Sequence, residues 1–144
     1  MGALVKRFRK RWQLTNEKVT PAFVDRVGYT WRVRLDEAAI ARIKDFLDVD
    51  LSAMNTGERL VWLGDLLQND IENTVNLLYV SILAHAEALG IDEDAFARAL
   101  DSDVIEAGGF ALAQAVARAE ADPSLRIKVL REVVHRWGNS HGFN

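Results

Sequence analysis

Apolar and polar residues alternate along residues 29–35, and this is the clearest strand pattern in the chain. Strict alternation that is rich in aromatic and β-branched residues predicts a β-strand with one buried face. We expect a partner strand at residues 22–25 and a turn at residues 26–28, where Gly28 is free to adopt a positive φ. Because two strands alone are marginally stable, their apolar face must pack on helices or pair with another chain. The apolar face of the second strand consists of Tyr29, Trp31, Val33 and Leu35.

After residue 35 the apolar residues recur at the spacing of an amphipathic helix. The spacing is most regular over residues 70–89, which we expect to form a central, mostly buried helix that ends at Gly90. Residues 104–121 are expected to form a helix that lets a neighbour approach closely, because they contain seven alanines and two glycines. Another helix is expected to start near Thr56. Acidic residues that can cap a helix stand at four further starts: Asp36, Asp92, Asp101, and Asp122 before a proline.

These patterns predict an α+β fold that is mostly α-helical, with about six helices and an N-terminal β-hairpin at about residues 22–35. The 144 residues fit a single domain. We place a basic, aromatic arm at residues 1–18, the domain at residues 19–137 and a loose tail at residues 138–144.

The net charge of −3 hides an uneven distribution of charge along the chain. Residues 1–35 carry 9 basic and 2 acidic groups, whereas residues 36–106 carry 4 basic and 16 acidic groups. A basic arm before an acidic body indicates either nucleic-acid binding or docking of the arm on an acidic protein surface.

Composition excludes several classes of protein. The chain has no cysteine, which rules out disulfides, cysteine-ligated zinc, iron–sulfur clusters and a thiol nucleophile. The longest uncharged run within a helical pattern, residues 73–86, is too short to span a bilayer. No apolar segment or small-residue cleavage site follows the basic N-terminus, so we expect no signal peptide, and the lack of cysteine suits a reducing cytoplasm.

The sequence shows no constellation of catalytic residues. His85 lies on the apolar stripe of the predicted central helix, where we expect a hydrogen-bonded core or interface residue, and His135 and His141 have no evident third metal ligand. The acidic pairs at 48/50, 92/94 and 101/103 lack the ligand order of a calcium loop, and helix capping explains them. No glycine-rich phosphate loop or nucleophile elbow is present. A paired-carboxylate hydrolase stays open, but nothing singles out two of the 21 acidic residues. We therefore predict a non-enzyme without catalytic, cofactor or metal site.

The N-terminal arm has three interpretations. Its cations and aromatic residues suit phosphate contacts and base stacking on a nucleic acid. The same residues suit docking on the acidic body of a neighbouring subunit, with the hairpin edge accepting a strand. The third interpretation is a solvated end. The arm residues concerned are Lys6, Arg7, Phe8, Arg9, Lys10, Arg11 and Trp12.

Two stretches together resemble one protein family. Residues 29–51, YTWRVRLDEAAIARIKDFLDVDL, resemble the opening of small phage tail assembly chaperones, in which a hairpin leads into a helix and a Val-Asp-Leu turn. Residues 77–116, LLYVSILAHAEALGIDEDAFARALDSDVIEAGGFALAQAV, resemble the later part of those proteins. The likeness covers roughly residues 22–117. The basic arm and the basic terminal helix depart from the family pattern.

The resemblance implies a non-enzymatic protein of phage or prophage tail morphogenesis. Such a chaperone binds the tape measure protein, keeps it soluble and extended, and helps to recruit the tail tube protein. The resemblance also implies a homo-oligomer in the cytoplasm of a bacterial host cell. The alternative is a virion structural or nucleic-acid-binding protein that uses the basic arm.

Four aromatic residues are further candidates for contact with a partner. Tyr29, Trp31 and Trp62 either contact a partner or are buried in the core of the monomer. Trp137 is the better interface candidate, because it lies on a short, late, amphipathic helix.

Overall fold

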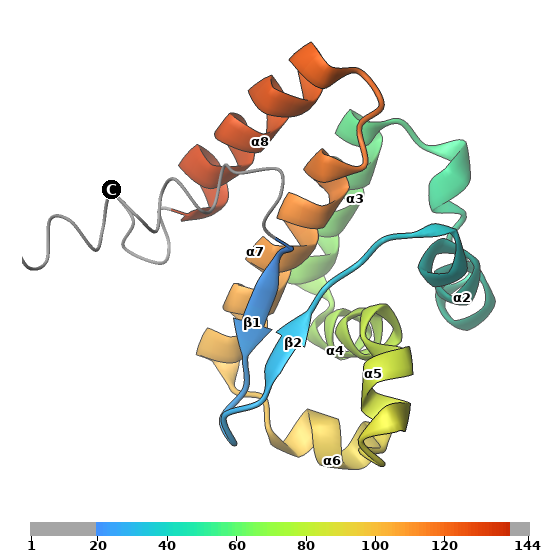
Figure 1. The fold of residues 1–144 in the computed structure, drawn as a ribbon, viewed down its shortest axis with the longest axis vertical. Coiled ribbons are helices and arrows are strands. Elements are labelled where there is room, and N and C mark those ends of the chain that lie inside the picture. Colours follow the sequence, from blue (N-terminus) through green and yellow to red (C-terminus); the bar gives the residue numbers. More distant parts are fainter. Residues whose placement is uncertain (1–19, 139–144) are drawn as a thin grey trace, which may run out of the picture.

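The structure, a computed structural model, describes residues 20–138 of the chain. This part contains one antiparallel hairpin, seven α-helices and a 3₁₀ turn (Figure 1). The predicted fold class, a mostly α-helical α+β domain with an N-terminal hairpin, is confirmed. No helix within residues 20–138 is long and apolar enough to cross a membrane. The elements are β1 (Ala22–Val24), β2 (Thr30–Arg32), α2 (Glu37–Leu47), η1 (Leu51–Ala53), α3 (Thr56–Asn69), α4 (Ile71–Ser81), α5 (Leu83–Ala88), α6 (Glu93–Arg98), α7 (Ser102–Arg118) and α8 (Pro123–Gly138).

The hairpin is shorter than the sequence predicts, because β2 ends at residue 32 rather than 35. Phe23 of β1 pairs with Trp31 of β2, and both side chains are buried against the helices. Gly28 has the expected positive φ, at 99°. One further bond, from the N–H of Val33 to the carbonyl oxygen of Pro21, closes the pairing at 2.9 Å. After Val33 the chain leaves the hairpin toward α2. The last residues of the alternating pattern, 34 and 35, therefore have no partner strand.

Helix starts follow the capping residues that the sequence predicts. Asp36, Asp92 and Asp101 each accept a hydrogen bond from the backbone N–H three residues later, at 2.8–2.9 Å. Helix α3 begins with a capping box between Asn55 and Glu58. Asp48 ends α2 in a left-handed conformation with φ 57°. The acidic pairs therefore act at helix ends, as expected.

The predicted single helix over residues 70–89 is wrong, because the chain breaks at Ile82 into α4 and α5. Ile82 has φ −118° and ψ 13°, outside the helical range, and its N–H bonds to Tyr79 and Val80 rather than to a residue four positions earlier. The hydroxyl of Ser81 donates to the carbonyl oxygen of Leu78 at 2.7 Å and competes with the helical ladder. Figure 1 shows α5 turning away from the axis of α4. This break accounts for seven helices instead of six.

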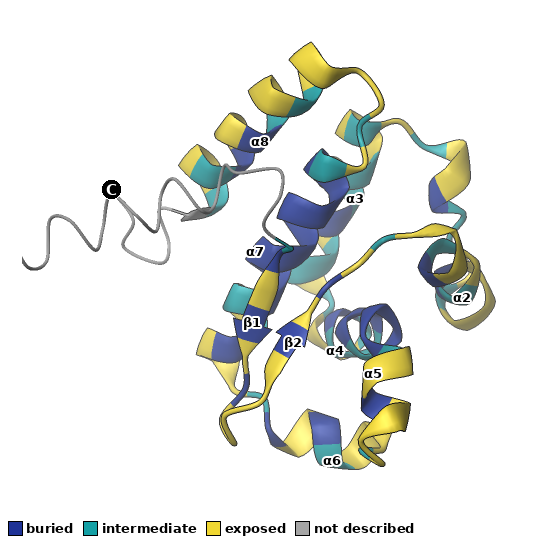
Figure 2. Cartoon of the chain, viewed as in Figure 1, coloured by how far each residue is buried: buried dark blue, intermediate teal, exposed yellow. Residues whose placement is uncertain are grey.

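Helix α7 is the centre of the core. It packs against β1, α3, α4 and α8, and all of its residues from 108 to 117 are buried (Figure 2). Gly108 faces Leu78 of α4 and Gly109 faces Leu67 of α3. A Cβ at either glycine would come within 2.8 Å of a leucine methyl group, so these glycines let α3 and α4 approach closely. The helix ends at residue 118, three residues earlier than the predicted end.

Candidate partner-binding groove

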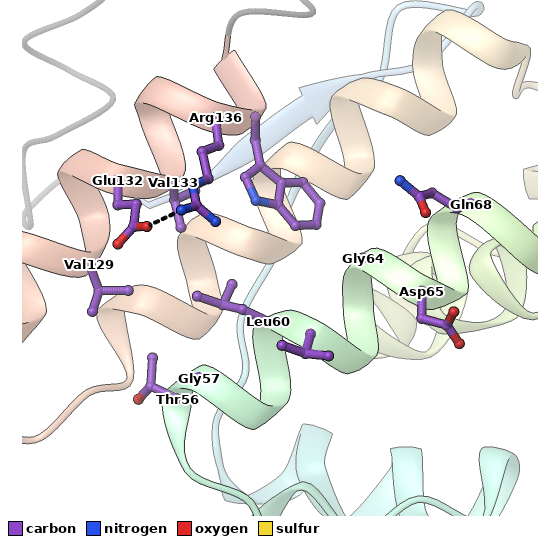
Figure 3. A pocket seen from close by; sticks show the side chains of 12 residues that line it. Thr56, Gly57, Leu60, Gly64, Asp65, Gln68, Val129, Glu132, Val133 and Arg136 are labelled. Atoms are coloured by element: carbon purple, nitrogen blue, oxygen red, sulfur yellow. Dashed lines mark ion pairs between the residues drawn. The ribbon is translucent and has the colours of Figure 1, made fainter.

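A groove separates α3 from α8, two helices that both pack against α7. It consists of two adjoining hollows of about 550 and 440 Å³. The hollows share Gly64 and Gln68 of α3 and Arg136 and Trp137 of α8, so they form one continuous depression. Phe110 of α7 lies at the second hollow. Figure 3 shows the two helices with their side chains around the first hollow.

Both walls of the groove are helical stripes. Their residues recur every three or four positions, as one face of a helix requires. The two walls therefore present two continuous helix faces across a gap. The α3 wall consists of Thr56, Gly57, Leu60, Val61, Gly64, Asp65 and Gln68, and the α8 wall of Val129, Glu132, Val133, Arg136 and Trp137.

The lining of the groove is largely apolar, and the charged side chain of Arg136 stands where the two hollows meet. Val61 lines the groove and is 74% exposed. Gly57 and Gly64 are seven positions apart on this side of α3, and the ring of Trp137 would lie 3.9 Å from a Cβ at Gly64. Glu132 and Arg136 form an ion pair at 2.9 Å along α8, drawn as a dashed line in Figure 3. A largely apolar hollow with a few charged groups is typical of a surface that binds another protein.

A hydrogen bond ties the start of α3 to the segment before α8. The hydroxyl of Thr56 donates to the carboxylate of Glu120, which also accepts the N–H of Asp122 at 3.2 Å. These two bonds hold the pKa of Glu120 below its ordinary value, and the bond from Thr56 has the larger effect. The bond therefore links Thr56, the first residue of the α3 wall, to the segment that leads into α8.

The structure places the predicted partner-binding residues in different surroundings. Trp31 is 0% exposed and donates from Nε1 to Asp25 at 2.9 Å, so it is a core residue. Tyr29 is 44% exposed and packs against Trp31. Trp62 is half-buried against the core, and Trp137 lines both hollows of the groove. The arm residues Lys6, Arg7, Phe8, Arg9, Lys10, Arg11 and Trp12 lie outside the described residues.

His85 is not in the core, so of its two predicted places only the interface stays a prediction. It is exposed and packs edge-on against Trp31, with 5.1 Å between the ring centroids. The reason is the break at Ile82, which ends the apolar stripe of α4 before His85. His135 is also exposed, and His141 lies outside the described residues. Within residues 20–138, no three histidine or acidic side chains gather as metal ligands would.

Sequence reasoning did not single out the α3 wall. The seven-residue spacing of Gly57 and Gly64, which puts both glycines on one side of the helix, is the signal in the sequence that could have found this wall. Comparison of the chain with protein-family models, with curated proteins and with solved structures finds no match. The proposal of a function therefore rests on the groove and on the family resemblance of the sequence.

Proposed function

We propose that this chain is a non-enzymatic tail assembly chaperone of a phage or prophage, which binds an apolar helical segment of the tape measure protein in the groove between α3 and α8. It acts as a homo-oligomer in the bacterial cytoplasm and helps to bring tail tube protein to the tape measure protein. The observation that carries the proposal is the pair of facing helical stripes that bound an apolar groove.

The shape of the groove suits a helix. The α3 wall runs from residue 56 to residue 68, about 18 Å along a helix axis. A third helix laid in the groove would bury the exposed side chain of Val61. Amphipathic helices bind in such grooves through residues spaced three or four positions apart. A chaperone that holds these segments would shield apolar residues of a long helical partner until assembly.

The test is to co-express the chain with the tape measure protein encoded in the same genome and to measure how much tape measure protein stays soluble. The informative variant is Val61→Asp, because Val61 is 74% exposed and a charge there leaves the core intact. An unpaired carboxylate in an apolar interface opposes binding. We expect Val61→Asp to weaken the complex at least tenfold in a pull-down.

The matched control is Val27→Asp. Val27 is 71% exposed in the turn of the hairpin, outside the groove, so this variant should behave as the unchanged chain. Tape measure protein that is equally soluble without the chain, or equally rescued by Val61→Asp, would contradict the proposal. Salt-sensitive binding of an oligonucleotide that disappears with removal of residues 1–14 would instead favour the nucleic-acid-binding alternative.

A further inference from the structure

A second pocket, of about 320 Å³, lies where the chain runs from β2 into α2 beside the junction of α4 and α5. It shares no residue with the groove. Three arginines from separate positions line it: Arg32 in β2, Arg34 after the strand, and Arg42 in α2. His85 of α5 lines it as well. The pocket therefore concentrates positive charge within a body whose residues 36–106 are strongly acidic.

The three guanidinium groups have no partner within the described part of the chain. No ion pair or side-chain hydrogen bond joins Arg32, Arg34 or Arg42 to another residue of 20–138. The Nε of Arg42 is buried and makes no hydrogen bond there. A buried donor without an acceptor costs free energy, and three like charges around one pocket repel one another. An anion in the pocket would remove both costs.

One carboxylate lines the pocket, and it already has a structural role. Asp36 accepts the N–H of Ala39 at 2.9 Å and caps α2. Its single negative charge does not balance three guanidinium groups. The charge that is left over matches a group with two negative charges.

We propose that this pocket binds the phosphate group of a small phosphorylated ligand. Guanidinium groups donate in a planar fork that matches the oxygens of a phosphate. Three of them suit a phosphate monoester, which is close to a dianion at neutral pH, better than a single carboxylate. Ile82 and Ala84 also line the pocket and offer apolar contacts to the part of the ligand that carries the phosphate. The acidic body repels a long polyanion, which argues for a small ligand over a polynucleotide.

Calorimetric titration of the full chain tests the proposal, with inorganic phosphate and adenosine 5′-monophosphate as probes and chloride holding the ionic strength constant. We expect saturable binding of both. Arg42→Gln and Arg34→Gln should each weaken binding at least tenfold, while Arg98→Gln should change it less than twofold. Arg98 is exposed on α6, outside the pocket, and its replacement removes the same charge. Arg34 is also exposed, so its variant remains informative if replacing the partly buried Arg42 disturbs folding.

Three results would overturn the proposal. The first is that titration with phosphate or the nucleotide releases no more heat than titration with chloride at equal ionic strength. The second is an equal loss of binding in Arg98→Gln, which would indicate a nonspecific effect of charge. The third is Arg42-dependent binding of a single-stranded oligonucleotide without binding of phosphate or the nucleotide. Val61→Asp in the groove should leave phosphate binding unchanged, so the two proposals fail independently.

Discussion

The carboxylate of Asp25 accepts four hydrogen bonds and thereby holds the hairpin together. Oδ1 accepts the backbone N–H groups of Val27, Gly28 and Tyr29 at 2.9–3.0 Å, which fixes the turn. Oδ2 accepts Nε1 of the fully buried Trp31 at 2.9 Å. One carboxylate thus accepts hydrogen bonds both from the backbone of the turn and from the largest side chain of the core.

We expect Asp25→Ala to lower the free energy of unfolding by about 3 kcal/mol, because it leaves the indole N–H of Trp31 buried without an acceptor and frees the turn. Urea denaturation measures the change. The control is Asp45→Ala, at an exposed site of α2, which should stay within about 0.5 kcal/mol of the unchanged chain. A similar loss in both variants would contradict the role given to Asp25.

A second prediction at the level of single residues concerns Glu120. Since its bond from Thr56 lowers the pKa, the ionised form stabilises the folded state above the ordinary value of 4.5, and this contribution is lost as pH falls through the lowered pKa. Thr56→Val should raise the pKa of Glu120 toward 4.5 and make stability less sensitive to acid. An NMR titration of the side-chain carboxyl measures it.

The control for Glu120 comes from a second hydroxyl. The hydroxyl of Ser52, more than any other group, lowers the pKa of Asp50. Ser52→Ala should therefore raise the pKa of Asp50 and leave that of Glu120 unchanged. If Thr56→Val left the pKa of Glu120 where it was, the bond between α3 and the segment before α8 would not exist in solution.

At the scale of elements, we expect alanine substitutions at the two glycines of α7 to change stability differently. Alanine favours a helix by about 1 kcal/mol over glycine. At Gly108 the added Cβ meets Leu78, which is 0% exposed and has nowhere to move, so overpacking outweighs this gain. At Gly109 it meets Leu67, which borders the groove and can shift into it.

We therefore expect Gly108→Ala to lower the free energy of unfolding by about 1 kcal/mol and Gly109→Ala to leave it nearly unchanged. Urea unfolding midpoints compare the two variants directly, and each serves as the control for the other. Equal losses would mean that the groove side of α3 is as rigid as the core.

The sequence predicts elements well where the cause is local. The starts of α2, α6 and α7 depend on one side chain and a backbone N–H three residues away, so Asp36, Asp92 and Asp101 predict them. The break at Ile82 was missed because the apolar spacing continues through it, and the competing bond of Ser81 leaves no trace in that spacing. Helical periodicity alone does not distinguish one helix from two.

The groove was beyond prediction for a different reason. Trp137 was singled out from its place on an amphipathic helix, and it does line the groove. Val61 and Gly64 line the groove because α3 and α8 lie apart on α7, and the spacing of residues along the chain carries no information about that gap. The pocket of the three arginines likewise depends on how β2, α2 and α5 meet.

At the scale of the whole molecule, the separation of charge predicts self-association through the arm. We expect oligomers at low salt that dissociate at high salt or on removal of residues 1–14, because ion pairs between a basic arm and an acidic body are screened. Size-exclusion chromatography with light scattering measures this. Replacing the exposed Lys128 by Gln, which removes a cation from the body instead, is the control. A monomer whose mass is indifferent to salt and to truncation would contradict it.

Helix α8 packs mainly on α7, through the buried side chains of Leu130 and Val133. We therefore expect α8 to detach without disturbing the hairpin or the contacts of α3 and α4 with α7. Amide hydrogen exchange should then show α8 opening at a lower free energy than α7. The α8 wall of the groove would then move away from α3, so the groove could admit a partner helix that is wider than the groove in this structure. Binding of that partner should slow amide hydrogen exchange in α8 more than in any other helix.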